Sequence, residues 1–108
     1  MTSTTLQLNS IFSALADPTR RDILKRVGKK ELPVGEVAKP YKLTLAAISK
    51  HLKVLEEAKL ILKRRQGKQQ LVHASPAAIR DASAFLKLYE AEWTDRFDRL
   101  EAYLIKNK

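Results

Sequence analysis

The sequence predicts a mainly α-helical chain with one small β-hairpin, folded as a single domain over residues 1–108. Most of its 108 residues lie in segments whose apolar side chains recur every three or four positions, as on one face of a helix. After Ala58 the pattern changes to two short β-type segments that meet at Gly67. With 44% apolar residues, a chain of this length can bury one compact core.

Two helices are expected before residue 30. The first carries apolar residues at helical spacing: Leu8, Ile11, Phe12 and Leu15. It should end near Ala16, because Asp17 can cap a following helix and Pro18 suits the first position of that helix. The second helix buries three apolar residues: Ile23, Leu24 and Val27. Gly28 is expected to end it.

A helix-turn-helix is expected at about residues 34–58. Its first helix runs from about residue 34 to Lys39 and stops because Pro40 disfavours helical geometry at the residue before it. Thr44 is expected to cap the second helix. One side of that helix is apolar, through Ile48, Leu52 and Leu55. The opposite side carries small or polar residues: Ala46, Ser49, Lys50 and Lys53.

A basic hairpin follows over about residues 60–73. The segments LILKRR and QQLVH have the composition of two short strands, with the turn at Gly67. Because side chains alternate along a strand, Lys63 and Arg65 should share one face while Arg64 takes the other.

The tail is expected to form one or two long helices over about residues 76–106, opened by Ser75 and Pro76. Its apolar residues recur at gaps of three or four: Phe85, Leu88, Tyr89, Trp93, Phe97, Leu100 and Leu104. An aromatic stripe of this kind favours packing in a core or in a dimer interface over a ligand pocket.

Positive charge is concentrated in the middle of the chain. The formal net charge is +9. Residues 39–68 hold nine lysines and arginines against two acids, whereas residues 81–108 hold five against six. A basic middle beside a neutral tail indicates one dedicated surface for a polyanionic partner.

Missing residue types argue against several classes of function. There is no cysteine, which removes disulfides, thiol catalysis and thiolate metal sites. The two histidines, His51 and His73, have no ligand spacing, so we expect no metal and no cofactor. No nucleophile has a plausible base and no phosphate loop occurs, so an enzyme is not expected. The absence of a membrane span or signal peptide indicates a cytoplasmic protein.

The order of these elements is that of a winged helix-turn-helix, and its parts suit double-stranded DNA. The major groove, about 12 Å wide, admits one helix whose exposed N-terminal face reaches the base edges. Ala46 permits close approach and can contact a thymine methyl group, while Ser49 can bond to bases or phosphate. Lys50 and Lys53 can pair with phosphate or guanine, and the positive helix end capped by Thr44 favours phosphate.

The hairpin supplies a second candidate surface for DNA. Its cations cluster around the turn: Lys63, Arg64, Arg65 and Lys68. An arginine can enter a narrow minor groove, and the sequence leaves open which of the two does so. Arg20, outside the hairpin, is a further candidate for a phosphate contact.

Four segments resemble the ArsR/SmtB family of bacterial repressors: ALADPTRRDIL (14–24), VGEVA (34–38), ISKHLKVLEEAKL (48–60) and EWTDRFDRLEAYL (92–104). The resemblance extends over nearly the whole chain, with the motifs in the family's order and spacing. It implies a homodimeric repressor whose recognition helix begins at Leu45, itself a candidate DNA contact, and whose wing flanks Gly67. It also implies that the first and last helices form the dimer interface, at Leu8, Ile11, Phe12, Phe85, Tyr89, Trp93, Phe97, Leu100 and Leu104.

The chain departs from the family at two kinds of position. Metal-sensing members carry a cysteine pair in the helix that matches residues 34–39, or histidine and acidic ligands in the last helix, and neither set occurs here. Lys42 and Lys59 stand where the family usually has glycine. Either lysine would cost about 1 kcal/mol relative to glycine if its φ were positive.

Two alternatives to a sequence-specific repressor remain open. Charge alone also suits a nonspecific architectural DNA-binding protein, and a winged helix can serve protein contacts instead. A sequence-reading dimer should prefer a two-fold symmetric site by about 4 to 10 kcal/mol over random DNA. The operator sequence and the inducer, whether a small molecule, a protein or none, are left open.

Overall fold

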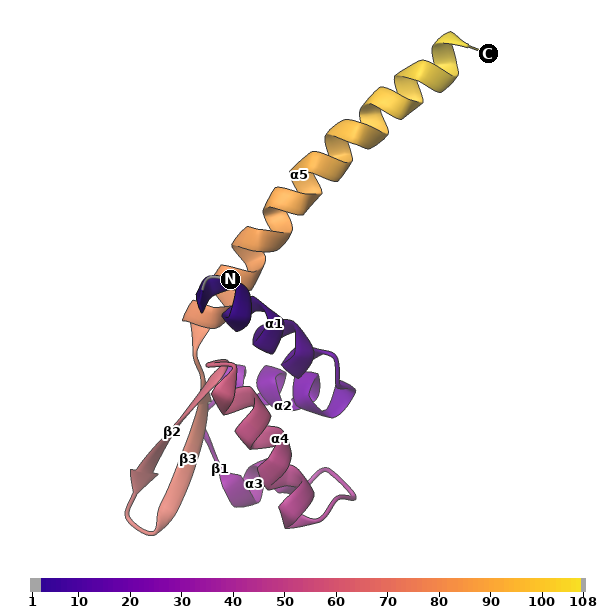
Figure 1. Cartoon of the computed structure of the whole chain (residues 1–108). Coiled ribbons are helices and arrows are strands. Elements are labelled where there is room, and N and C mark those ends of the chain that lie inside the picture. Colours follow the sequence, from indigo (N-terminus) through magenta and orange to yellow (C-terminus); the bar gives the residue numbers. More distant parts are fainter. Residues whose placement is uncertain (1–2, 108) are drawn as a thin grey trace.

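The chain is mainly helical, in agreement with the predicted fold class (Figure 1). A computed structural model describes the backbone of residues 3–107 and the side chains of residues 7–107. Along this part of the chain the elements are α1 (Ser3–Leu15), α2 (Pro18–Lys29), β1 (Leu32–Pro33), α3 (Val34–Ala38), α4 (Leu45–Glu57), β2 (Ile61–Gln66), β3 (Gln69–Ala74) and α5 (Pro76–Lys106).

Three helices begin at the polar residues that the sequence predicts. Asp17 Oδ2 accepts a hydrogen bond from the Arg20 backbone N–H at 3.0 Å. Thr44 Oγ1 accepts one from the Ala47 N–H at 3.1 Å. Each oxygen satisfies an N–H that has no partner within the helix. Ser75 occupies the capping position of α5, but its side chain makes no capping bond.

Two helix ends are set by backbone geometry. Gly28 does not end α2 as predicted, because a single glycine costs a helix only about 1 kcal/mol and the backbone becomes extended only at Lys30. After α4, Lys59 adopts a φ of 61°, a left-handed turn that costs about 1 kcal/mol more than with glycine. Lys42 does not share this geometry.

The hairpin belongs to a three-stranded antiparallel sheet with the order β1-β3-β2. β2 and β3 pair along their whole length, and Gly67 in the turn between them has a φ of 63°. β1 adds Leu32 and Pro33 beside β3. The sequence did not predict β1, since two residues carry no periodicity and proline donates no ladder hydrogen bond. Pro33 is tolerated because β1 is an edge strand.

The core joins α1–α4 to the base of the sheet. Ile48, Leu52 and Leu55, the predicted buried side of α4, are each at most 1% exposed. Other parts of the chain contribute further fully buried side chains: Ile11, Ile23, Val37, Leu60, Ile61 and Val72. The expectation that Ile11 lies in a dimer interface is wrong, because its side chain is 0% exposed within its own chain.

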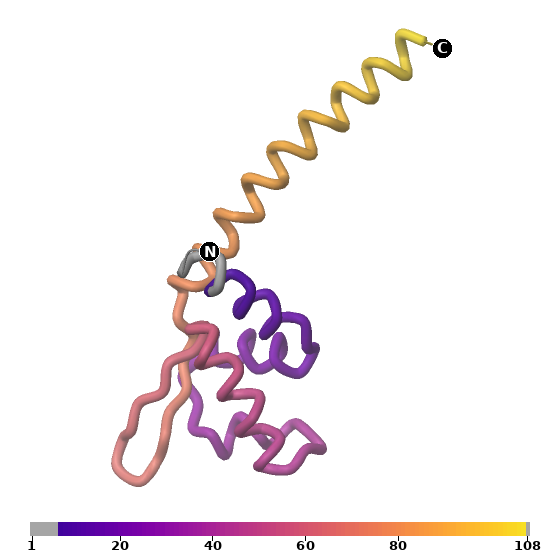
Figure 2. The backbone as a smooth tube through the Cα atoms, viewed as in Figure 1, coloured from indigo at the N-terminus to yellow at the C-terminus, as the bar shows by residue number. Residues whose placement is uncertain are grey.

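The tail is one continuous helix that extends far beyond the core (Figure 1). Its first turns bury Ala78 and Ala82 beside α1. The Cα radius of gyration is 18.8 Å, whereas a compact domain of this length has about 13 Å. The hairpin turn and the loop between α3 and α4 lie at the end of the molecule opposite the C-terminus (Figure 2).

Candidate nucleic-acid interface

The exposed face of α4 starts at its first residue. Leu45 is 67% exposed. The other candidate contacts on this helix are also exposed: Ala46, Ser49, Lys50 and Lys53. Because the opposite side of α4 is buried in the core, these small and cationic side chains can face a groove without loss of packing.

Arg26 of α2 holds the turn that precedes α4. Its Nη1 donates to the Val37 carbonyl and its Nη2 to the Glu36 carbonyl, both at 2.9 Å. These carbonyls lie at the end of α3, where a cation is favourable. Arg26 also lies over the Tyr41 ring, 5.5 Å from its centroid, and donates to its hydroxyl at 3.2 Å. The Tyr41 hydroxyl in turn donates to Asp22.

The surroundings of Tyr41 raise the pKa of its hydroxyl. Burial disfavours the phenolate, and the hydrogen bond to Asp22 acts in the same direction. Tyr41 therefore remains a hydrogen-bond donor at neutral pH, and the loop between α3 and α4 is bound to α2 by polar contacts as well as by the core.

Two of the four predicted wing cations are paired with acids outside the hairpin. Lys63 Nζ lies 3.4 Å from Oε1 of Glu56 on α4, and only 19% of the lysine side chain is exposed. Arg64 donates to both carboxylate oxygens of Glu31, at 2.9 and 2.6 Å. The Arg64 guanidinium holds the pKa of Glu31 below its usual value. The first pair fastens the hairpin to α4, and the second fastens it to the segment between α2 and β1.

The other two wing cations, Arg65 and Lys68, are exposed and form no ion pair within the described residues. The alternation of β2 places Arg65 on the same face as Lys63. Arg65 and Lys68 are thus the wing cations most accessible to a phosphate backbone.

The cationic surface is smaller than the sequence count indicates. Of the nine bases in residues 39–68, Lys39 is also paired, with Glu36 at 2.6 Å. The remaining six make no ion pair in the part of the chain that the structure describes: Lys42, Lys50, Lys53, Lys59, Arg65 and Lys68. They belong to α4, to the segments that flank it, and to the hairpin.

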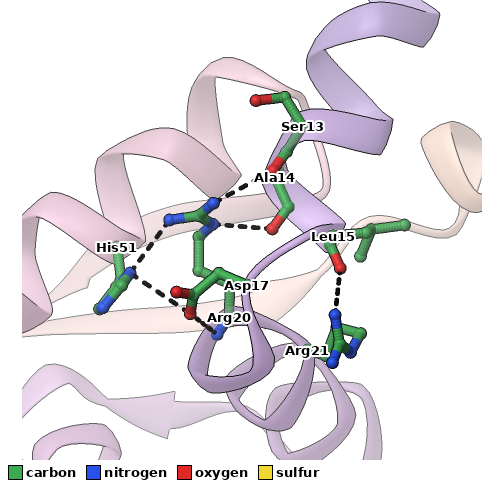
Figure 3. A network of polar contacts seen from close by, with 7 residues as sticks. All are labelled: Ser13, Ala14, Leu15, Asp17, Arg20, Arg21 and His51. Atoms are coloured by element: carbon green, nitrogen blue, oxygen red, sulfur yellow. Dashed lines mark hydrogen bonds and ion pairs between the residues drawn. The ribbon is translucent and has the colours of Figure 1, made fainter.

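Arg20 is directed into the protein (Figure 3). Its Nε donates to the Ala14 carbonyl at 2.7 Å, and its Nη2 donates to the Ser13 carbonyl at 3.1 Å. Its Nη1 lies 3.3 Å from Nδ1 of His51. Since these internal partners use the guanidinium, we leave Arg20 out of the candidate DNA surface.

The remaining candidate dimer residues fall into two groups. Leu8, Phe12 and Phe85 are half-buried, and the Phe85 ring lies 6.0 Å from Phe12 and 5.0 Å from Tyr89. The others are 47–60% exposed: Tyr89, Trp93, Phe97, Leu100 and Leu104.

Sequence reasoning missed the partners that hold these elements together. Arg26, Glu31 and Glu56 were not predicted to have structural roles. Glu31 and Arg64, for example, are 33 residues apart, so no local pattern connects them. Within the described residues, no group of three side chains could hold a metal ion, and no described helix could cross a bilayer.

The fold and its cationic face define the class of winged helix-turn-helix transcriptional regulators. Residues 15–64 match a family model described as a helix-turn-helix domain. The crystal structure of an ArsR family transcriptional regulator is similar, with a TM-score of 0.79 and 34% identity over 87% of this chain and 97% of that one. The chain belongs to the ArsR/SmtB family of transcriptional regulators, and not to a family of enzymes.

Two curated relatives agree with this assignment. The HTH-type transcriptional regulator Rv2034 of Mycobacterium tuberculosis is 38% identical over 68 residues, which are 63% of this chain and 64% of the relative. The transcriptional repressor SdpR of Bacillus subtilis is 35% identical over 60 residues, 56% of this chain and 67% of the relative. The match thus spans about two thirds of the length of these relatives.

Proposed function

We propose that this chain is a homodimeric repressor that binds a two-fold symmetric operator in double-stranded DNA. The observation that carries the proposal is that α4 exposes a face with small side chains beside a cationic hairpin. The helix suits the floor of a major groove, and the hairpin suits a phosphate backbone or a minor groove.

The chemistry of each side chain determines the part of the DNA to which we assign it. Ala46 and Ser49 approach base edges, because small side chains let the helix enter deeply. Lys50 and Lys53 contact phosphate or guanine, and the N–H groups at the start of α4 add a favourable dipole. Arg65 is the wing arginine that we assign to the minor groove, because Arg64 is held by Glu31.

The proposed dimer is supported by the exposed apolar face of α5. Five large side chains on it recur at gaps of four, four, three and four: Tyr89, Trp93, Phe97, Leu100 and Leu104. The mean spacing is close to 3.6 residues, so they form one stripe along a straight helix. Soluble monomers rarely expose a continuous stripe of this kind, and a second copy would cover it.

An open groove extends the same face toward α1. Its volume is about 330 Å³, and its lining includes Phe12, Leu15, Ile79 and Leu86. We assign this groove and the stripe to one interface, which matches the first-and-last-helix arrangement expected from the family. A dimer built this way would present two copies of α4 to DNA.

Repression is the proposed outcome of operator binding, as SdpR is named a transcriptional repressor. A dimer on a promoter blocks access by occupancy and needs no chemical step. We place the protein in the cytoplasm, where it would meet chromosomal DNA, and we include no metal or cofactor in the mechanism.

Selection of bound sites from random duplex DNA tests the proposal. We expect an enriched two-fold symmetric sequence with half-sites about one helical turn apart, bound about a thousandfold or more tightly than random DNA at physiological salt. Equal binding of all sequences would indicate an architectural protein. Weak binding with little dependence on salt would favour a role in protein contacts.

A further inference from the structure

Three helices meet at the guanidinium of Arg20 (Figure 3). Arg20 belongs to α2 and donates to the Ser13 and Ala14 carbonyls in the last turn of α1. The Ser13 carbonyl also accepts from the Ala16 N–H at 3.2 Å, and a cation at the end of a helix stabilises its last carbonyls. The third group is Nδ1 of His51, on α4 between the exposed Lys50 and the buried Leu52.

A hydrogen bond from Arg20 to His51 requires one tautomer of the imidazole. Arginine only donates hydrogen bonds, so Nδ1 must accept and the ring proton must be on Nε2. Asp17 Oδ2 lies 3.9 Å from the same Nδ1, beyond hydrogen-bonding distance. The ring is also shielded, since 20% of the His51 side chain is exposed.

We propose that Arg20 and His51 are positioning residues that set the rotation of the recognition helix relative to α1. This inference rests on the proposed function, because it treats α4 as the DNA-reading helix and α1 as part of the dimer interface. The pair would then link the dimer interface to the surface that contacts bases.

The physical reason is that apolar packing is not directional, whereas a hydrogen bond is. Ile48, Leu52 and Leu55 hold α4 against the core but would permit a small rotation about its axis. With side-chain tips about 5 Å from that axis, a rotation of about 10° moves them by about 1 Å. A shift of that size is enough to weaken hydrogen bonds to bases, while flexible lysines still reach phosphate.

Three substitutions distinguish positioning from direct contact. His51→Leu removes the acceptor, His51→Asn keeps an oxygen acceptor near the position of Nδ1, and Arg20→Lys keeps the charge but loses the guanidinium fork. We expect His51→Leu and Arg20→Lys each to reduce the preference for the selected operator over random DNA about tenfold. The salt dependence of binding should be unchanged, and His51→Asn should restore most of the preference.

The pair should also behave as one unit. The double variant Arg20→Lys/His51→Leu should lose no more preference than either single variant. Far-ultraviolet circular dichroism of each variant at the assay temperature establishes that it is folded. If His51→Leu does not fold, the comparison of His51→Asn with the unchanged protein and the NMR measurement below decide the question.

The NMR test needs no DNA. The ¹⁵N shifts of the imidazole at pH 7.5 should show the neutral tautomer with the proton on Nε2, and Arg20→Lys should change the Nδ1 shift. A proton on Nδ1 would overturn the proposal. So would an unchanged preference in His51→Leu. A salt slope flattened by about one in Arg20→Gln, which removes the charge, would mark a direct phosphate contact and would also overturn it. If the unchanged protein prefers no sequence, the proposed function is wrong. The NMR result then still shows whether Arg20 and His51 form the hydrogen bond.

Discussion

At the scale of single residues, the neighbouring wing arginines Arg64 and Arg65 have different surroundings, although nothing in the sequence distinguishes them. Arg65 is exposed without an ion pair in the described structure, whereas Arg64 is held by both oxygens of Glu31. Charge count alone therefore overestimates the DNA-binding surface. The local environment of each cation determines how readily it can exchange water for phosphate.

Arg65→Ala should weaken operator binding and flatten the plot of log affinity against log salt concentration by about one unit, because one phosphate-neutralising charge is lost. Arg64→Ala is the matched control, and its slope should change less, since its charge is already balanced by Glu31. Fluorescence anisotropy titrations over a range of salt concentrations measure both slopes. Equal flattening in the two variants would contradict the assignment of Arg65.

Lys59 offers a test of backbone strain. Its φ of 61° suits glycine, so Lys59→Gly should raise the free energy of unfolding by about 1 kcal/mol. Lys42→Gly, at the other position where the family usually has glycine, should bring no such gain, because Lys42 does not have a positive φ. Urea denaturation of both variants measures the difference, and an equal response would show that left-handed strain is not the cause.

At the scale of elements, the sequence predicted what local patterns encode. The apolar side of α4, its Thr44 cap and the hairpin around Gly67 all follow from spacing or turn chemistry and agree with the structure. β1 could not be predicted, because its two residues form a strand only through pairing with β3, which is distant in the sequence. The Arg26 contacts with α3 were missed for a related reason, since they depend on how α2 packs against a distant segment.

The same limit applies to the candidate site. Ser49, Lys50 and Lys53 could be assigned to one face from helical geometry alone, and the structure places them there. Arg20 has the same charge as these lysines, but its direction depends on the corner between α1 and α2. No periodicity in the sequence encodes that corner, so only the structure shows that the Arg20 side chain points inward.

The Asp17 cap allows a pH-dependent prediction at the level of α2. Asp17→Ala should lower the free energy of unfolding by about 1 kcal/mol at neutral pH. The hydrogen bond from the Arg20 N–H lowers the pKa of Asp17, so the folded state favours the carboxylate. The cap's contribution is therefore present above the usual aspartate range and is lost as pH falls through the lowered folded value.

Urea unfolding at several pH values tests this expectation. The difference in free energy of unfolding between Asp17→Ala and the unchanged protein should be largest near neutral pH and should shrink below about pH 4. Asp98→Ala, an exposed aspartate on α5, serves as the control and should have little effect. A difference that grows as the solution is acidified would contradict the capping account.

At the scale of the whole molecule, the elongated shape of the single chain supports the proposed dimer. Its extents are 68 × 32 × 22 Å, and no other element of the described residues packs beside the projecting part of α5 in Figure 1. Charged side chains of both signs surround the apolar stripe, so attraction to an anionic surface does not explain it. A second copy of the same helix is the partner we propose, since it offers an equal stripe.

Trp93 and Leu88 provide a matched pair for testing the dimer. Trp93 lies in the stripe and is 47% exposed, whereas Leu88 is 73% exposed and about 140° away around the helix. Trp93→Ala should raise the dimer dissociation constant at least about tenfold, because large aromatic side chains dominate interface energetics. Leu88→Ala should leave it nearly unchanged, and sedimentation equilibrium measures both constants.

The effect of Trp93→Ala should extend to DNA although the residue lies far along α5 from the hairpin. Two linked half-site contacts give an affinity well above that of one, because the second contact forms within the complex. A weakened dimer should therefore bind a full operator only at higher protein concentration, while its affinity for an isolated half-site stays unchanged. Equal losses on both DNAs would instead mean that Trp93 supports the fold of each subunit, and the stripe would need another occupant.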